Sequence, residues 1–249
     1  MQYSVCIDAV YRGKDFIKAM EEVNALGYST IEFWGWEDKD IPAIKAQCNR
    51  LKMTVSTFCS KSTSLVDPKA HEAYLVGLKE SLEVAKDLGV TKLITLVGND
   101  TGAPRIEQHQ HLIKGLKACV PLLEAAGVTL MIEALNTKVD HPGYYLTASS
   151  EACEVVEAVN SPFVKIIFDI YHQYAMGDEV EANIKKQVNY IHHFHSAGYP
   201  GRHELSHGEM VYPKIFNLIK ASGYEGYIGL EYFPELDPKV GLAEVTLLV

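Results

Sequence analysis

Residues 123–136 read LEAAGVTLMIEALN, and this stretch contains the pattern that decides the fold. A helical segment stops at Gly127, a short apolar run follows, and Glu133 closes that run before a polar loop. Glycine is favoured where a helix ends in the left-handed region, and a short apolar run bounded by turn residues is typical of a buried strand. The stretch therefore predicts a helix, a strand and a loop in direct succession.

The same succession recurs about eight times along the chain. Strands are expected at 3–7, 30–33, 54–58, 92–96, 129–133, 164–169, 191–195 and 227–231. Helices are expected at 14–26, 41–51, 68–88, 106–126, 149–159, 179–188 and 212–222, with a last one after Pro238. Alternating strands and helices predict parallel strands. An open doubly wound sheet typically has a GxGxxG motif after its first strand, and this chain has none there. We therefore expect an α/β fold, a closed (β/α)8 barrel.

Length and charge narrow the class of protein. The 249 residues, 47% of them hydrophobic, can bury a full core, and no linker-like stretch divides them, so 1–249 is expected to be a single domain. Lys and Arg number 23 against 32 Asp and Glu, a formal net charge of -9. Such a chain repels phosphate backbones and anionic lipid, which argues against nucleic acid and membranes as partners.

The cysteines and the first residues bear on the compartment. Five cysteines are an odd number, and their wide spacing argues against both a disulfide framework and a thiolate zinc site. No apolar stretch is long enough for a membrane span, and Met1 leads into a strand-like segment instead of a secretory leader. We expect a cytoplasmic protein.

Four expected strands end in a side chain that can bind a metal ion: Glu133, Asp169, His195 and Glu231. Active sites of such barrels lie at the carboxyl ends of the strands. One carboxylate alone is as well explained by a salt bridge or a helix cap, but four candidates at consecutive strand ends favour a shared cation that offsets the cost of burying their charge. Three carboxylates and an imidazole suit one divalent ion, Mn²⁺ or Mg²⁺ first, with Zn²⁺ or Co²⁺ as alternatives.

Four further residues are candidates for substrate binding. His172 follows Asp169 by three residues and can bond a substrate oxygen, and Arg202, in a long polar loop, can clamp an anion or a hydroxyl. Glu32 and Trp34 close the second strand and can form the wall of a small pocket. The alternatives are a satisfied loop histidine, a solvated loop and, for Trp34, packing against a second copy in a homo-oligomer.

Two more histidines precede His195 on its strand. Alternation along a strand places His193 on the same face as His195, one layer deeper, and turns His192 towards the helices. We expect His193 to be a packed core residue instead of a ligand.

Several blocks of the sequence resemble a known family: EALNTKVDHPGYYL, FDIYH, PGRHE and GYEGYIGLEYFP between 133 and 234, with IEFWGW near the second strand. They resemble the xylose isomerase-like superfamily of TIM barrels and, within it, the hydroxypyruvate isomerases. The resemblance implies that Glu133, Asp169, residue 195 and Glu231 bind the metal, that Glu133 and Glu231 act as acid and base, and that His172 and Arg202 position substrate.

One departure leaves the substrate open. Hydroxypyruvate isomerases carry Gln where this chain has His195, and His at that position is similar to the ketose 3-epimerases. The same superfamily includes the endonuclease IV enzymes, whose extra metal-binding histidines at the second and third strands are missing here. A barrel that only binds a metal and a sugar acid is the alternative outside catalysis.

The resemblance and the residues together predict a metal-dependent isomerase acting on a small sugar or hydroxy-keto acid. Hydroxypyruvate to tartronate semialdehyde is the first expectation, and a ketose 3-epimerase is the alternative. Both reactions remove a proton beside a carbonyl and pass through an enediolate, which a cation and paired carboxylates can stabilise. The sequence alone does not separate them.

Overall fold

Eight parallel strands close into a barrel in the computed structural model, which describes residues 1–248. The strands are β1 (Gln2–Cys6), β2 (Thr30–Phe33), β3 (Thr54–Cys59), β4 (Lys92–Thr95), β5 (Thr129–Glu133), β6 (Val164–Asp169), β7 (Ile191–Ser196) and β8 (Tyr227–Leu230). Each strand pairs with its neighbours in the chain, and β8 returns to pair with β1, with Tyr3 opposite Ile228. The expected (β/α)8 barrel is confirmed.

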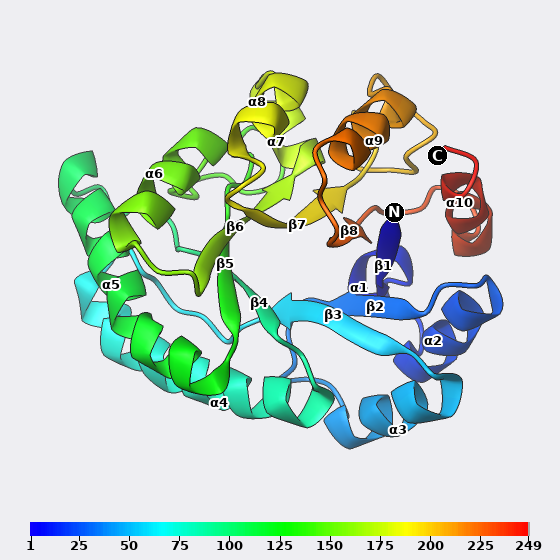
Figure 1. The fold of residues 1–249 in the computed structure, drawn as a ribbon, viewed down its shortest axis with the longest axis horizontal. Coiled ribbons are helices and arrows are strands. Elements are labelled where there is room, and N and C mark those ends of the chain that lie inside the picture. Colours follow the sequence, from blue (N-terminus) through cyan, green and yellow to red (C-terminus); the bar gives the residue numbers. More distant parts are fainter. Residues whose placement is uncertain (249) are drawn as a thin grey trace.

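Helices form a ring outside the strands (Figure 1). They are α1 (Ile7–Val10), α2 (Phe16–Ala25), α3 (Ile41–Leu51), α4 (His71–Leu88), α5 (Arg105–Ala126), α6 (Ser149–Val159), α7 (Ile170–Met176), α8 (Val180–Gln187), α9 (Tyr212–Ala221) and α10 (Pro238–Val245), with a 3-10 turn at η1 (Pro68–Ala70). Gly89 and Gly127 end α4 and α5 in the left-handed region, as the sequence predicts. None of the described helices is both long and apolar enough to cross a bilayer.

Two short helices, α1 and α7, are missing from the prediction. Ile7 does not extend the first strand, because α1 begins at that residue. A short helix, α7, follows β6 directly and is missing from the prediction. Its N-cap is Asp169, whose side-chain Oδ1 accepts a hydrogen bond from the backbone N–H of His172. Asp169 is therefore both the last residue of β6 and the N-cap of α7. Because no polar loop separates the two elements, the sequence pattern does not mark where the helix begins.

The apolar core has two parts, a large one and a small cluster on β4, β5 and β6, and the small cluster lies beneath Glu133. Most buried apolar side chains fill the space between strands and helices. A small separate cluster of Ile94, Met131 and Ile167 packs on neighbouring strands. Met131 precedes Glu133 by two residues and so shares its face of β5, which places this cluster inside the barrel beneath Glu133. The carboxylate therefore stands on a packed apolar layer.

Candidate metal centre and active site

The four expected metal ligands come together at the carboxyl ends of β5 to β8. Glu133 and Asp169 end β5 and β6, His195 is in β7, and Glu231 follows β8 by one residue. One ligand atom from each lies within 4.8 Å of the others, and all four residues are buried. Consecutive strand ends of a closed barrel meet at one mouth, so residues far apart in sequence meet in space.

His195 lies at the centre of this group. Its Nδ1 is 3.2 Å from Glu231 Oε2, 3.4 Å from Glu133 Oε1 and 4.0 Å from Asp169 Oδ2. Among the described residues, neither His195 Nδ1 nor Glu133 Oε1 makes a well-aligned hydrogen bond, although both atoms are buried. Unsatisfied buried polar atoms are costly, and a divalent cation among three carboxylate oxygens and one nitrogen would satisfy them. The donor set therefore fits such an ion.

Asp169 is the most buried of the three carboxylates in the candidate metal group, at 2% exposed. Burial raises its pKa above the ordinary value, while the Arg202 charge acts in the opposite direction. The backbone N–H of His172 donates to Asp169 Oδ1 at 2.8 Å, so this carboxylate also holds the start of α7 in place. The position of the Asp169 carboxylate is thereby linked to that of α7.

Glu231 is held from two sides. Trp34 Nε1 donates to its Oε1 at 2.5 Å, and Arg202 Nη2 donates to its Oε2 at 2.5 Å. Burial alone would raise the pKa of Glu231, but the charges of Arg202 and His195 outweigh burial and hold that pKa well below its usual range. Glu231 is therefore an ionised group with both oxygens bonded.

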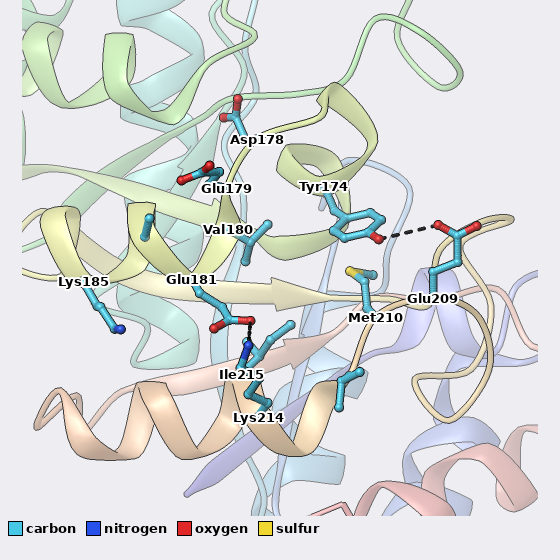
Figure 2. Close-up of a pocket in the computed structure, with 12 residues that line it drawn as sticks. Tyr174, Asp178, Glu179, Val180, Glu181, Lys185, Glu209, Met210, Lys214 and Ile215 are labelled. Atoms are coloured by element: carbon cyan, nitrogen blue, oxygen red, sulfur yellow. Dashed lines mark hydrogen bonds and ion pairs between the residues drawn. The ribbon is translucent and has the colours of Figure 1, made fainter.

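Close contacts surround Arg202 and the loop that carries it. Arg202 adopts a φ of +61°, and its guanidinium lies 5.5 Å from the Tyr171 ring and 5.4 Å from the Phe233 ring. Any side chain at Gly208 would overlap the backbone of the same loop. Figure 2 shows the outer flank of this loop, where Glu209 accepts a hydrogen bond from Tyr174 of α7 at 3.5 Å. These contacts hold the Arg202 guanidinium between two aromatic rings and beside Glu231.

His172 is fixed as a neutral hydrogen-bond donor. The backbone N–H and side-chain amide of Asn136 both lie against its Nδ1, at 3.3 and 2.7 Å. Because Nδ1 accepts, the ring proton is on Nε2, which is buried without a partner among the described residues and lies 3.7 Å from Asp169 Oδ2. Burial, aided by the charge of Arg202, lowers the pKa of His172 to about 3. Asn136 is absent from the predicted site, although it follows Glu133 by three residues.

A cavity of about 410 Å³ opens over this group. Expected residues in its wall are Trp34, Glu133, His172, Arg202 and Glu231. Residues that the sequence analysis did not single out also line it: Arg12, Cys59, Leu96, Leu135, Asp140, His141 and Phe233. Several follow strand ends or lie in the EALNTKVDHPG block, which is the signal that could have identified them.

Glu32 has a different place from the one expected. It does not line the cavity and is 0% exposed. Its carboxylate lies deeper in the barrel, where Oε2 is 2.9 Å from His193 Nε2 and Oε1 is 2.8 Å from His195 Nε2. Burial would raise the pKa of Glu32, but the two imidazoles outweigh it and lower the pKa to about 2. His193 is a packed core residue, as predicted.

Comparison with known proteins agrees with this geometry. The model of the xylose isomerase-like TIM barrel family matches residues 20–245. Hydroxypyruvate isomerase of Escherichia coli (strain K12) is 28% identical, over 97% of both chains. The 2-oxo-tetronate isomerase of Cupriavidus necator is 26% identical, over 97% of this chain and 96% of its own. A Brucella melitensis protein described as an AP endonuclease, family 2, superimposes with a TM-score of 0.94 at 24% identity, over 99% of this chain and 98% of that one, which is a likeness of fold.

The family match spans most of the sequence, and the two isomerase relatives align along almost its whole length. The closed eight-stranded barrel is the fold that the family's description names. The chain belongs to the xylose isomerase-like TIM barrel family.

Proposed function

We propose that the protein is a metal-dependent isomerase of a small hydroxy-oxo acid, of the type that converts hydroxypyruvate to tartronate semialdehyde. The observation that carries the proposal is the group of Glu133, Asp169, His195 and Glu231, with ligand atoms within 4.8 Å of one another beside a cavity of about 410 Å³. The names of the two full-length relatives support the same reaction class.

The same four residues would hold one divalent ion, Mn²⁺ or Mg²⁺ in the first place, because three carboxylates dominate the set. When bound, such an ion supplies Lewis-acid stabilisation of the negative charge that develops on the substrate oxygens. The remaining chemistry is proton transfer, which the side chains perform.

Glu133 is the proposed base. Within the described residues neither carboxylate oxygen of Glu133 accepts an aligned hydrogen bond, so Oε1 can face the ion and Oε2 the substrate, whereas both oxygens of Glu231 already accept one. Glu133 takes a proton from C3 of hydroxypyruvate; the electron pair forms a C2–C3 double bond, and the C2 carbonyl oxygen takes the charge. Return of that proton to C2, with transfer of the C3 hydroxyl proton to the C2 oxygen, leaves an aldehyde at C3. Atoms and charge balance.

His172 assists as a donor. Its Nε2 carries the proton because Asn136 occupies Nδ1, and a neutral imidazole with a pKa near 3 does not lose its role as the pH changes around neutrality. This N–H is proposed to bond the substrate oxygen that becomes negative.

Arg12 favours an acid over a neutral sugar. Its guanidinium lies in the cavity wall, 5.3 Å from the Phe233 ring, and within the described chain no carboxylate forms an ion pair with it. Arg202, by contrast, is already paired with Glu231. An unpaired guanidinium at the mouth suits the carboxylate of a hydroxy-oxo acid, which it can bind in bidentate fashion.

A ketose 3-epimerase is the second candidate, and His195 is the residue that favours it. Epimerisation delivers the proton to the opposite face and so requires Glu231 to exchange a proton as freely as Glu133. The bonds from Trp34 and Arg202 to Glu231 argue against equal roles. One base returning the proton on one face is the simpler match to this asymmetry.

Proton NMR in deuterium oxide tests the proposal. The protein, loaded with Mn²⁺ or Mg²⁺, is incubated with hydroxypyruvate and separately with fructose, tagatose and ribulose, with the chelated protein as control; Mg²⁺ gives the sharper lines. Tartronate semialdehyde formation is the expected result. A ketose inverted at carbon 3 would support the epimerase instead, and bound metal with neither product nor exchange of substrate protons would support a binding protein.

A further inference from the structure

The ionisable groups inside the barrel continue beyond the metal centre. Below His195 lie Glu32 and His193, both 0% exposed. Within the described residues the only ion pairs of Glu32 are with these two histidines, since no Lys or Arg lies within 4.0 Å. A carboxylate at such depth costs several kcal/mol unless it is compensated. Its presence in the barrel interior therefore calls for a specific role.

His195 lies between two groups of oxygens. Its Nδ1 side faces Glu133, Asp169 and Glu231, and its Nε2 is 2.8 Å from Glu32 Oε1. An imidazole that binds a cation through one nitrogen carries its proton on the other. If Nδ1 takes the cation, the proton is on Nε2, and the atom that meets it is Glu32 Oε1.

Glu32 is itself held in position. His193 Nε2 contacts its Oε2 at 2.9 Å, and Ser56 Oγ donates to the same oxygen at 3.2 Å. Ser56 Oγ is in turn 2.6 Å from Ser4 Oγ. Side chains from β1, β3 and β7 therefore form a hydrogen-bonded network around a carboxylate on β2.

Room for this contact comes from β8. A Cβ at Gly229 would overlap Glu32 Oε1 and lie 2.5 Å from His195 Cδ2. Only glycine leaves the space in which the carboxylate and the imidazole meet. In the described structure Glu32 Oε1 and both nitrogens of His195 are buried without a well-aligned hydrogen bond. A rotation of the His195 ring can therefore improve the contact of Nε2 with Glu32 and that of Nδ1 with the three carboxylates together.

We propose that Glu32 is the positioning residue for the metal-binding histidine: it holds His195 with Nδ1 directed at the three carboxylates and the proton on Nε2. The inference rests on the metal-dependent function proposed above. Glu32 does not touch substrate and acts through His195. Partners of this kind that orient a metal ligand typically contribute a factor of about 10 to 100 in metal affinity.

The test is a titration of the chelated protein with Mn²⁺ in the absence of substrate, followed by the electron paramagnetic resonance of free Mn²⁺. Glu32→Gln keeps the shape but removes the charge, and its Kd is expected to rise about 10- to 100-fold. Ser56→Ala leaves the carboxylate in place and is expected to weaken binding less. Circular dichroism and Tm establish that each variant is folded, and if Glu32→Gln does not fold, Ser56→Ala and Glu32→Asp carry the comparison.

A double-mutant cycle separates positioning from general stability. In a His195→Gln background there is no imidazole tautomer to fix, so adding Glu32→Gln should change the Mn²⁺ Kd by no more than about twofold. An unchanged Kd in Glu32→Gln alone, or an equal loss in both backgrounds, would overturn the inference. So would two Mn²⁺ bound per chain, because Glu32, His193 and His195 would then form a second metal site. Metal affinity is read without substrate, so an inactive protein would refute the proposed function and leave this result standing.

Discussion

The side-chain amide of Asn136 donates to Nδ1 of His172 at 2.7 Å, and the backbone N–H of the same residue supports it at 3.3 Å. Two donors on one nitrogen leave the imidazole a single tautomer, with its proton on the cavity side. The amide is itself fixed, because Asn136 Oδ1 accepts from the backbone N–H groups of Val139 and Asp140.

Substitution Asn136→Ala is expected to lower kcat/KM about tenfold, because His172 then divides between two tautomers and only one donates to substrate. Nitrogen-15 NMR of the imidazole measures the tautomer directly. In the unsubstituted protein the signal should show neutral His172 with Nε2–H from pH 5 to 9. Titration of that signal near pH 6 would contradict the assignment.

Substitution Glu133→Gln is expected to lower turnover about 100- to 10,000-fold, because the group that removes the substrate proton is lost. Metal should remain at least partly bound, since Asp169, His195 and Glu231 are untouched. Mn²⁺ binding and deuterium exchange of substrate protons are measured on the same sample. Glu231→Gln is the comparison: if exchange survives in Glu133→Gln and disappears only in Glu231→Gln, the two roles are reversed.

Substitution Arg202→Gln is expected to move the acid limb of the kcat/KM profile to higher pH. The guanidinium holds the pKa of Glu231 down, so its removal lets that pKa rise, and the ionised fraction falls at a higher pH. Arg202→Lys keeps the charge and should keep the limb near its original position. Identical limbs in both variants would show that Arg202 does not control the ionisation of Glu231.

Substitution Arg12→Gln is expected to raise KM for hydroxypyruvate about tenfold with little change in kcat, because it removes one charge-assisted contact to the carboxylate. Arg50→Gln is the matched control, since Arg50 pairs with Glu21 away from the cavity. Steady-state kinetics measure both. An equal rise in KM for a neutral ketose would refute the recognition of a carboxylate by Arg12.

His192 should make the protein less stable in acid. Burial and the nearby charge of Lys92 lower its pKa from 6.5 to about 4. The unfolded chain therefore binds this proton first, and stability falls as pH drops from about 6.5 to 4. Allowing for partial solvent screening, we expect about 1 to 2 kcal/mol. Urea unfolding across this pH range should show a smaller loss of unfolding free energy in His192→Gln than in the unsubstituted protein. Equal losses in the two proteins would show that His192 does not cause the acid destabilisation.

The barrel was predictable because its signal is repeated. A helix stop such as Gly127 before a strand and an ionisable residue such as Glu133 at its end form a pattern that recurs at later strands. An error at one strand or helix therefore does not change the predicted number of strands. The missed helix α7 shows the limit: Asp169 ends a strand and caps a helix at once, and the pattern has no gap there.

That Glu133, Asp169, His195 and Glu231 lie close together was predictable because the strand ends of a barrel converge, and their binding of a metal stays a prediction. Asn136 and Arg12 were not predictable, because their roles depend on loop conformations that bring them to His172 and Phe233. Glu32 illustrates a third case. Its place at the end of β2 was evident, but whether its carboxylate faces the cavity or the interior depends on the space left by Gly229 on a strand almost 200 residues later.

Gly229 also bears on how this sequence can change. An added methyl group there would overlap Glu32 Oε1 and the His195 ring, so the residues at positions 32, 195 and 229 depend on one another. Replacing the imidazole by an amide would remove the contact of a residue-229 side chain with His195 Cδ2 but not its overlap with Glu32 Oε1, so a change at one position limits what the other two can become. Variant libraries built on this barrel should therefore randomise the three codons together.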